Sequence, residues 1–389
     1  MRRRTSKRYF TLTFVTFCLL LQQSTAFARG DVRAESRESG SENAIETLVQ
    51  RRAKNLGTGM NLTFLDHHWK GAKENGFSDF LDSIDVQKRK DMLREIARAG
   101  YETVRIPVCF SAWVNNKAPY SWRSKAGLEA LDKTVKWARE NDLNVIIDQH
   151  HPELDGSIES LTDIERIEWI WKQVAERYKD TDPDRVYFEL WNEPHDIEAK
   201  AWRKKAARLI TKVRSIVPSH SLIVGFHDWN GRQAMIDSKP FSDKNLIYTF
   251  HFYDPFVFTH QGASWSAEGL PDISGVPFPY DKAKKINIPD SAKGKWAGGL
   301  IQNYERDSSS KKIYADLRAA KEWSVTNGVP IYVGEFGSYT KYADQESRCR
   351  HFTVLYNAFR KLGLPNAAWE WDGGFNMFKN GSGEILPCV

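Results

Sequence analysis

The chain has 389 residues, of which 41% are hydrophobic and 27% charged, and its formal net charge is +6. Five basic residues and no acidic one fall within the first 28 positions, so the remainder carries a net charge of 6 − 5 = +1. A nearly neutral protein lacks the basic surface typical of binding to nucleic acid or to an anionic membrane.

The first 28 residues have the pattern of a secretory signal peptide. A positive head precedes a mostly apolar stretch over 10–21, and Ala26-Phe27-Ala28 resembles a signal peptidase site. The apolar stretch is short for a membrane span, although a retained signal anchor is the alternative. We expect cleavage after Ala28, a polar stretch over 29–46 and one folded domain over 47–389, in a secreted or periplasmic protein without membrane attachment.

Three cysteines remain after such cleavage: Cys109, Cys349 and Cys388. Export permits disulfides, and we favour Cys349 with Cys388 because that bond would tie the C-terminal tail to the last helices. Three buried thiols are the alternative, since a sequence does not fix connectivity. No cysteine spacing indicates a metal site.

Along the chain, short apolar runs that end in polar residues alternate with amphipathic stretches. The runs are 57–62, 103–108, 144–150, 186–193, 222–227, 246–251, 330–335 and 367–371. The stretches include 88–99, 128–141, 164–178, 199–216, 315–327 and 345–362. Continuous apolar strands separated by helices indicate a parallel sheet covered on both faces, and eight of them predict a (β/α)8 TIM barrel. A doubly wound sheet is the competing topology, but it would gather polar residues at one crevice.

One connection, 254–312, is unusually long. It shows little helical periodicity and is rich in glycine, proline and aromatic residues. Long loops in compact domains are usually functional or disordered. The aromatic residues favour an ordered loop after strand six that lies over the functional end of the barrel.

Two glutamates end separate apolar runs. Glu193 lies in Trp191-Asn192-Glu193-Pro194, and Glu335 follows 142 residues later in Gly334-Glu335-Phe336-Gly337. Paired carboxyl groups are the requirement for glycosidic bond cleavage. We expect Glu193 to be the acid/base, with a pKa raised by burial and by the second carboxylate, and Glu335 to be the ionised nucleophile.

Other polar residues at strand ends complete the predicted site. Arg105 and Tyr253 are candidate donors to Glu335, and Asn192 can bind a sugar hydroxyl. Histidines end several runs: His150, His151, His227 and His251. Each also has an ordinary explanation as a hydrogen-bonded rim residue. A zinc site is conceivable, but the carboxylate–histidine ligand pattern is lacking, so we predict no metal.

Aromatic residues are the other expected sugar contacts, because pyranose rings pack on aromatic planes. We expect Trp369, at the end of the last run, to stack on a sugar. Trp113, Trp169 and Trp171 are predicted to be core residues. Weaker sugar-binding candidates are Trp69, Trp229, Trp265 and Trp371.

Taken together, these motifs resemble glycoside hydrolase family 5 over roughly residues 50–380. The motifs are Gly59-Met60-Asn61-Leu62, Val104-Arg105-Ile106-Pro107, Asp148-Gln149-His150-His151, Trp191-Asn192-Glu193-Pro194, His251-Phe252-Tyr253, Gly334-Glu335-Phe336-Gly337 and Trp369-Glu370-Trp371. The resemblance implies that Glu193 is the proton donor and Glu335 the nucleophile. It also implies that the cleaved subsite is shaped by Arg105, His150, Asn192, His251, Tyr253 and Trp369.

The chain departs from the family pattern in two places. Residues 63–69 replace a common Gly-Asn continuation, and 253–263 is not a general family feature. We expect the second departure to mark a subgroup with its own substrate preference.

The sequence therefore predicts a secreted, retaining endo-β-1,4-glucanase that acts on a β-linked polysaccharide as a monomer, without a cofactor. A β-mannanase and a β-1,3- or mixed-linkage glucanase remain open. An enzyme for lipid-linked or small glycosides and a sugar-binding barrel without turnover also remain open.

Overall fold

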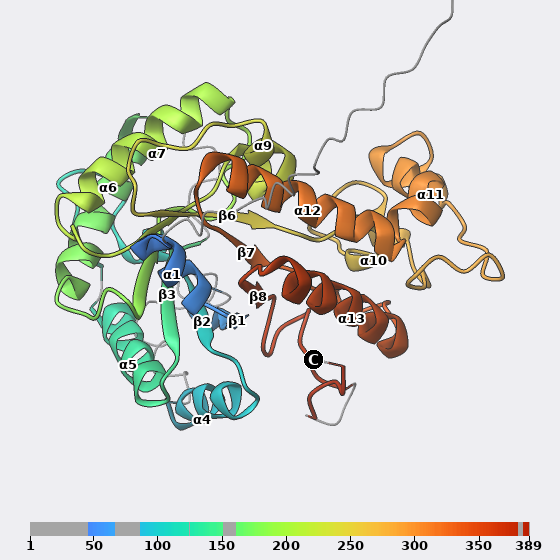
Figure 1. The fold of residues 1–389 in the computed structure, drawn as a ribbon, viewed down its shortest axis with the longest axis horizontal. Helices are drawn as coiled ribbons and strands as arrows, with labels where there is room; N and C mark the ends of the chain where they lie inside the picture. The colour runs from blue at the N-terminus through green and yellow to red at the C-terminus, as the bar shows by residue number, and fades with distance from the viewer. Residues whose placement is uncertain (1–45, 67–85, 124, 151–160, 380–383, 389) are drawn as a thin grey trace, which may run out of the picture. The chain divides into compact units, whose positions relative to one another are not determined.

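The computed structural model describes residues 46–66, 86–123, 125–150, 161–379 and 384–388. Within them, eight parallel strands close into a barrel in the order of the sequence, as predicted (Figure 1). Closure occurs where β8 pairs with β1, with Asn366 opposite Thr58. The strands are β1 Thr58–Asn61, β2 Thr103–Val108, β3 Asn144–Gln149, β4 Val186–Glu189, β5 Leu222–Val224, β6 Leu246–His251, β7 Ile331–Glu335 and β8 Asn366–Ala368.

The strands are buried on both faces, which explains their continuous apolar character. Every residue of β2, β3 and β6 is buried. Side chains that point inward fill the barrel, and those that point outward pack under the helices. Polar and charged residues within these strands, such as Arg105 and Asp148, are therefore exceptions that require partners inside the barrel.

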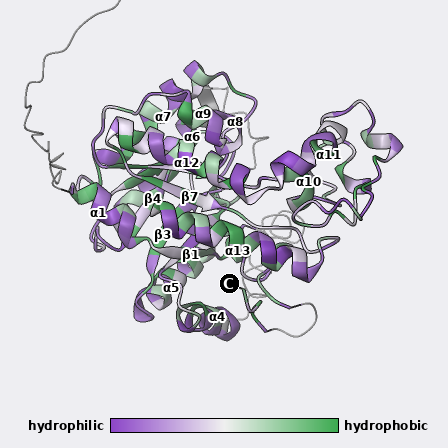
Figure 2. Cartoon of the chain, turned by 45° about the vertical axis from the view of Figure 1, so that its right-hand side comes forward, coloured by the Kyte–Doolittle hydropathy of each residue, from purple (hydrophilic) through white to green (hydrophobic). Residues whose placement is uncertain are grey.

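The outer helices match the predicted amphipathic stretches to within a few residues. They are α4 Val86–Arg98, α5 Ala126–Glu140, α6 Leu161–Tyr178, α7 Ala199–Arg214, α12 Ser310–Asn327 and α13 Gln345–Leu362. In α13, Asp344 caps the first turn by accepting from the Ser347 amide, and Gly363 ends the helix with φ 59°. Figure 2 shows hydrophilic and hydrophobic residues side by side along α13, as expected for a helix with one face on the sheet.

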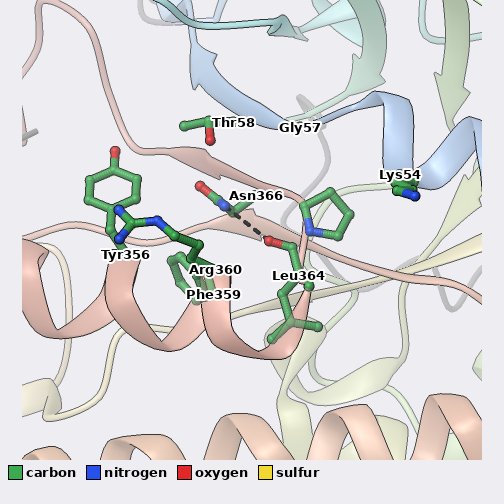
Figure 3. Close-up of a pocket in the computed structure, with 10 residues that line it drawn as sticks. Lys54, Gly57, Thr58, Tyr356, Phe359, Arg360, Leu364 and Asn366 are labelled. Atoms are coloured by element: carbon green, nitrogen blue, oxygen red, sulfur yellow. Dashed lines mark hydrogen bonds between the residues drawn. The ribbon is translucent and has the colours of Figure 1, made fainter.

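A short helix closes the end of the barrel at which the strands begin. α1 (Leu48–Asn55) begins with a capping box between Thr47 and Gln50. Val49, Ala53 and Leu56 form one cluster with interior residues of the barrel. At the same end, a pocket of about 250 Å³ lies between the starts of β1 and β8 and the end of α13, lined by Thr58, Asn366 and Arg360 among others (Figure 3).

The long connection after β6 contains more helix than predicted. It holds α10 (Phe256–Thr259) and α11 (Trp296–Asp307), and α12 begins at Ser310. The expectation of little helix in this segment was wrong for α11. Gly298 and Gly299 lower the helix propensity of this segment and leave two positions of the amphipathic pattern without a side chain. The helix forms because Ala297, Gly298 and Tyr304 are buried.

The C-terminal tail is tied to α13 by a disulfide between Cys349 and Cys388, which confirms the favoured pairing. Cys109 is buried and not bonded to another cysteine. No helix in the described part of the chain has the length and apolarity that a membrane crossing requires. The expected signal peptide lies outside the described residues, as does the polar stretch up to position 45.

Candidate active site

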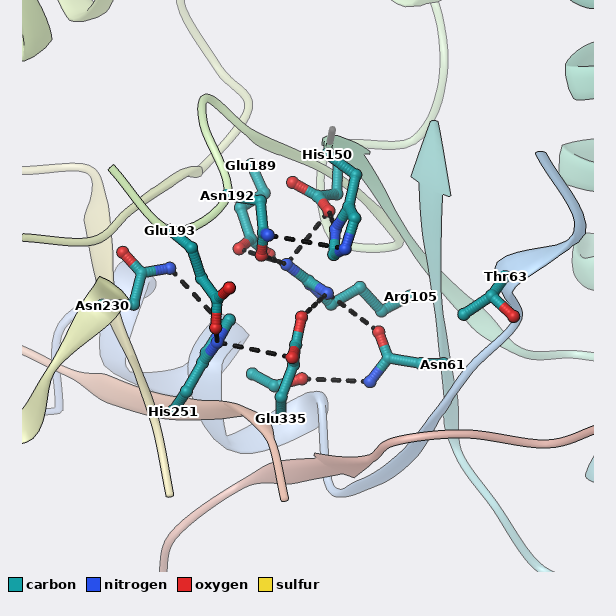
Figure 4. A network of polar contacts seen from close by, with 12 residues as sticks. Asn61, Thr63, Arg105, His150, Glu189, Asn192, Glu193, Asn230, His251 and Glu335 are labelled. Carbon is teal, nitrogen blue, oxygen red and sulfur yellow. Dashed lines mark hydrogen bonds and ion pairs between the residues drawn. The ribbon is translucent and has the colours of Figure 1, made fainter. Parts of the chain in front are cut away.

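Polar side chains from six strands meet at the ends at which the strands finish. Asn61 and Glu335 are the last residues of β1 and β7, and His251 is the last residue of β6. Arg105 and Glu189 reach the same network from β2 and β4 (Figure 4), and Asp148 reaches it from β3 through its contact with Arg105. In a barrel of this kind, the C-terminal ends of the strands form the functional face.

Glu193 lies four residues beyond the end of β4, on a loop rather than at the strand end. Its φ of 46° is in the left-handed region, which is uncommon for a residue with a side chain. The loop is held by two backbone bonds, from Asn192 to Gln149 and from Trp229 to Pro194. Glu193 Oε1 lies 2.7 Å from His251 Nδ1, and the Glu193 side chain is 24% exposed.

Glu335 is nearly buried and receives hydrogen bonds on both carboxyl oxygens. Arg105 donates to Oε1 at 2.9 Å, and the Tyr253 hydroxyl donates to Oε2 at 2.9 Å, as predicted. Burial raises the pKa of Glu335 to about 7, opposed by Arg105 and Tyr253 and reinforced by Glu193. The predicted donors are therefore present, but desolvation of the carboxylate is the larger effect, and the ionised form is favoured only above about pH 7.

Arg105 is the centre of the network and has more partners than the sequence suggested. It is fully buried and binds both oxygens of Glu189 at 2.8 Å. It also lies 3.0 Å from Asp148 and donates to Asn61 and Asn192. Sequence reasoning missed Glu189 and Asp148. The available signal was a carboxyl group inside each of two buried strands, which needs a positively charged partner as much as Arg105 needs a negative one.

His150, Asn192 and Trp369 form a second group beside Arg105. His150 Nδ1 lies 2.6 Å from Asp148 Oδ2, and its Nε2 faces the Asn192 amide at 3.4 Å. The Trp369 ring stacks on the His150 ring, with centroids 5.1 Å apart and planes 9° apart. The imidazole therefore packs against one face of the indole and fixes the orientation of that ring. His151 lies outside the described residues.

Three side chains offer donor atoms to a metal ion. One atom each from Glu193, His251 and Glu335 fall within 4.8 Å of one another. Both Glu335 oxygens already accept hydrogen bonds, and the Arg105 guanidinium 2.9 Å away adds a positive charge that repels a cation. This donor set suits proton transfer and nucleophilic attack better than metal binding.

The tryptophans divide between core and surface. Trp113 and Trp171 are buried as predicted, and Trp169 is partly buried against the core. Trp229 and Trp265 are more than half exposed, and Trp229 stacks on His195 with centroids 3.6 Å apart. Trp371, a weaker candidate for sugar binding, is only 2% exposed and belongs to the core, so that hypothesis was wrong. Trp69 lies outside the described residues.

Two further residues differ from expectation on the β5 side. β5 ends at Val224, so His227 lies three residues beyond the strand and not at its end. Asn230, which the sequence did not single out, is buried between Glu193 and His251 (Figure 4). Its placement depends on a left-handed turn that no periodic pattern encodes.

Residues 57–374 match the family described as Cellulase (glycosyl hydrolase family 5). Endoglucanase 3 of Fibrobacter succinogenes is 28% identical over 86% of this chain and 52% of its own length. Endoglucanase H of Acetivibrio thermocellus is 28% identical over 88% of this chain and 32% of its own. The chain thus spans about half and about a third of these two relatives.

Solved structures are similar over most of both chains. Thermotoga maritima Cel5A in complex with cellobiose superposes with a TM-score of 0.68 at 29% identity, over 85% of this chain and 94% of that one. A hyperthermophilic endo-β-1,4-glucanase in complex with substrate gives 0.70 at 27% identity, over 87% and 97%. The family match covers most of the chain, and these structures share its closed barrel. The chain therefore belongs to glycosyl hydrolase family 5, the cellulase family.

Proposed function

We propose that this protein is a retaining endo-β-1,4-glucanase that is exported from the cell. The observation that carries the mechanism is the approach of the two glutamates, since a carboxyl oxygen of Glu193 lies within 4.8 Å of one of Glu335. Carboxyl groups are about 5–5.5 Å apart in retaining glycosidases and about 6.5–9.5 Å apart in inverting ones, which need room for a water molecule.

The surroundings of each glutamate support its role. In the first step, Glu335 attacks the anomeric carbon while Glu193 donates a proton to the leaving oxygen. In the second step, Glu193 takes a proton from water, which then cleaves the glycosyl ester. Arg105 and Tyr253 hold the attacking carboxylate by one hydrogen bond on each oxygen. The more exposed Glu193 is the group that solvent and the leaving group can reach.

The relatives support β-1,4-glucan as the substrate. The curated relatives described above are named endoglucanases, and one of the similar structures is an endo-β-1,4-glucanase with bound substrate. A β-mannanase is the second candidate, because Thermotoga maritima Cel5A also has a structure in complex with mannotriose. Both substrates would use the same pair of glutamates.

The test of substrate is release of reducing sugar from carboxymethylcellulose, barley mixed-linkage glucan, laminarin, glucomannan and galactomannan. We expect wild-type activity on carboxymethylcellulose that is lost in Glu193→Gln. Glu198→Gln is the matched control, because Glu198 is exposed five residues farther along and should retain activity. Activity on mannans alone would show that the substrate is a mannan and would leave the proposed mechanism unchanged. No activity on any of the five polysaccharides would reject the polysaccharide hypothesis.

The test of retention is the configuration of the first product, read by proton NMR during hydrolysis of a cellooligosaccharide. A β-linked substrate should give the β-anomer first. A 2-deoxy-2-fluoro cellobioside with a good leaving group should add its glycosyl mass to the peptide that contains Glu335. Initial release of the α-anomer would contradict the retaining mechanism.

We further propose that residues 1–28 direct export and are removed. Their composition supports this, and the Cys349–Cys388 disulfide is of a kind that persists in oxidising compartments. The mass of the protein recovered from the medium or periplasm should correspond to a chain that begins at Arg29. Recovery of the full-length chain in the membrane fraction would support a retained anchor instead.

A further inference from the structure

Asn230 occupies a buried position between the loop that carries Glu193 and the strand that carries His251 (Figure 4). The three residues Asp228, Trp229 and Asn230 have φ values of 63°, 60° and 53°, so the chain turns left-handed after β5. This turn directs the Asn230 amide inward. Gly225 provides the space, since a Cβ at that position would lie 1.9 Å from the amide.

The hydrogen-bonding surroundings fix the orientation of this amide. Both of its ends are satisfied when the nitrogen donates to the Phe226 carbonyl at 3.2 Å and the oxygen accepts from the Glu193 backbone amide at 3.3 Å. The end that then carries the oxygen lies 3.4 Å from His251 Nε2. A carbonyl oxygen can only accept, so His251 Nε2 carries a hydrogen.

The other ring nitrogen then faces Glu193 with a lone pair. His251 Nδ1 and Glu193 Oε1 are 2.7 Å apart, a distance that requires a proton between them, whereas Glu335 Oε2 lies farther from Nδ1, at 3.4 Å. Burial lowers the pKa of His251 to about 4, with Glu335 and Glu189 opposing and Arg105 reinforcing this effect. In a neutral ring whose hydrogen is on Nε2, the shared proton belongs to Glu193.

We infer that Asn230 is a positioning residue that holds His251 in the Nε2–H tautomer and thereby keeps Glu193 in its acid form. This inference rests on the proposed function and deepens it. After Glu193 has given its proton to the leaving oxygen, its carboxylate faces the Nδ1 lone pair at short range. That repulsion favours the return of a proton from water in the second step, which regenerates the acid.

The tautomer can be tested without any turnover, by ¹⁵N NMR of histidine-labelled protein at pH 7, with the His251 signals assigned by their loss in His251→Gln. We expect Nε2 of His251 to be protonated and Nδ1 to be bare. Asn230→Gly keeps a residue that accepts positive φ and should lose this preference, whereas Asn230→Asp should keep it because a carboxylate still accepts from Nε2–H. Asp228→Gly, at an exposed position with φ 63°, is the matched control.

A hydrogen on Nδ1 in the wild type, or an unchanged tautomer in Asn230→Gly, would overturn the inference. Gly225→Ala provides a second route if Asn230→Gly does not fold. The new methyl group should displace the amide while Asn230 itself remains, and it should produce the same change in tautomer.

Kinetics separate positioning from a general structural role. With aryl β-cellobiosides, Asn230→Gly should lower kcat/KM about tenfold or more for leaving groups that need a proton, a part of the roughly 10²–10⁴-fold that general acid catalysis contributes. It should have little effect on 2,4-dinitrophenyl β-cellobioside, whose leaving group needs no proton. Equal losses on both substrates would contradict the inference. An inactive wild type would instead reject the proposed function, while the NMR result would still decide the tautomer.

Discussion

Arg105 brings one positive charge into contact with three carboxyl groups of the site, those of Asp148, Glu189 and Glu335. All four side chains are nearly or fully buried, so the contacts among these groups must compensate for the water that each has lost. Burial raises the pKa of Glu189 although Arg105 binds it directly. Burial also outweighs the hydrogen-bond donors at Glu335. The pKa of Glu335 therefore depends on each hydrogen bond that its carboxyl group accepts.

The Tyr253 hydroxyl is the donor to Glu335 that can be removed with the least disturbance. Tyr253→Phe deletes its bond to Oε2 and with it one of the contacts that lower the pKa of Glu335. In the proposed mechanism Glu335 is the nucleophile and must be ionised, so activity is expected above this pKa and is lost as the pH falls through it. We expect the acid limb of the kcat/KM–pH profile, near pH 7 in the wild type, to move to higher pH.

Tyr280→Phe is the control for this experiment, because Tyr280 is exposed on the long connection after β6. Its acid limb should coincide with that of the wild type. An acid limb that stays in place, or moves to lower pH, in Tyr253→Phe would show that the hydroxyl does not stabilise the ionised nucleophile.

The sequence predicted part of the network of carboxyl groups around Arg105, but not every member of it and not the residue that a turn places beside it. Arg105, Tyr253 and the two glutamates were predictable because a buried arginine needs a partner and strand ends gather on one face of a barrel. Glu189 and Asp148 lie inside apolar runs and were read as strand residues. Asn230 depends on three consecutive positive φ values, which no hydrophobic period specifies.

At the level of elements, the helices with a strong amphipathic pattern formed where expected. The sequence of α11 lacks such a pattern. Its two adjacent glycines have different surroundings. A Cβ at Gly298 would lie 2.3 Å from the Ala292 carbonyl oxygen, whereas one at Gly299 would meet nothing within 4 Å. Gly298 thus allows α11 to pack closely against the preceding loop, and Gly299 has no such role.

These neighbours provide a matched pair of substitutions. Gly299→Ala should raise the free energy of unfolding by about 0.5–1 kcal/mol, because alanine favours the helix and restricts the unfolded chain. Gly298→Ala should lower it by about 1–3 kcal/mol through steric overlap. Chemical denaturation of both variants would measure the two effects. Stabilisation by both would show that α11 does not need the close contact at Gly298.

For the whole molecule, the residues that close the barrel and the residues of the candidate active site lie at opposite ends of the strands. α1 and the cluster around Leu56 close one end, and the carboxyl network lies at the other. Eight apolar runs separated by helices were enough to predict the closed order of strands, because right-handed crossovers leave few other arrangements. The helix α1 lies before the first strand and was not predicted, although Thr47 and Gln50 form a capping-box pattern there.

This separation predicts a variant that loses stability and keeps activity. Leu56→Ala removes a fully buried side chain from the closing cluster and should cost about 2–5 kcal/mol in the free energy of unfolding. Below the unfolding transition, kcat/KM should equal that of the wild type. Leu48→Ala is the control, because Leu48 is the first residue of α1 and is 47% exposed. This substitution should change the free energy of unfolding by less than about 0.5 kcal/mol. A fall in kcat/KM for Leu56→Ala in folded protein would show that the two ends are coupled.

The number of partners around Arg105 has a consequence for the catalytic cycle we propose. When a sugar is esterified to Glu335, that carboxyl group loses its negative charge, and an arginine with no other partner would be left as an isolated buried cation. Here Glu189 still holds two of its nitrogens, and Asp148 and the two asparagines remain. The guanidinium can therefore keep one position in the free enzyme and in the covalent intermediate, and both half-reactions can proceed on the same rigid framework.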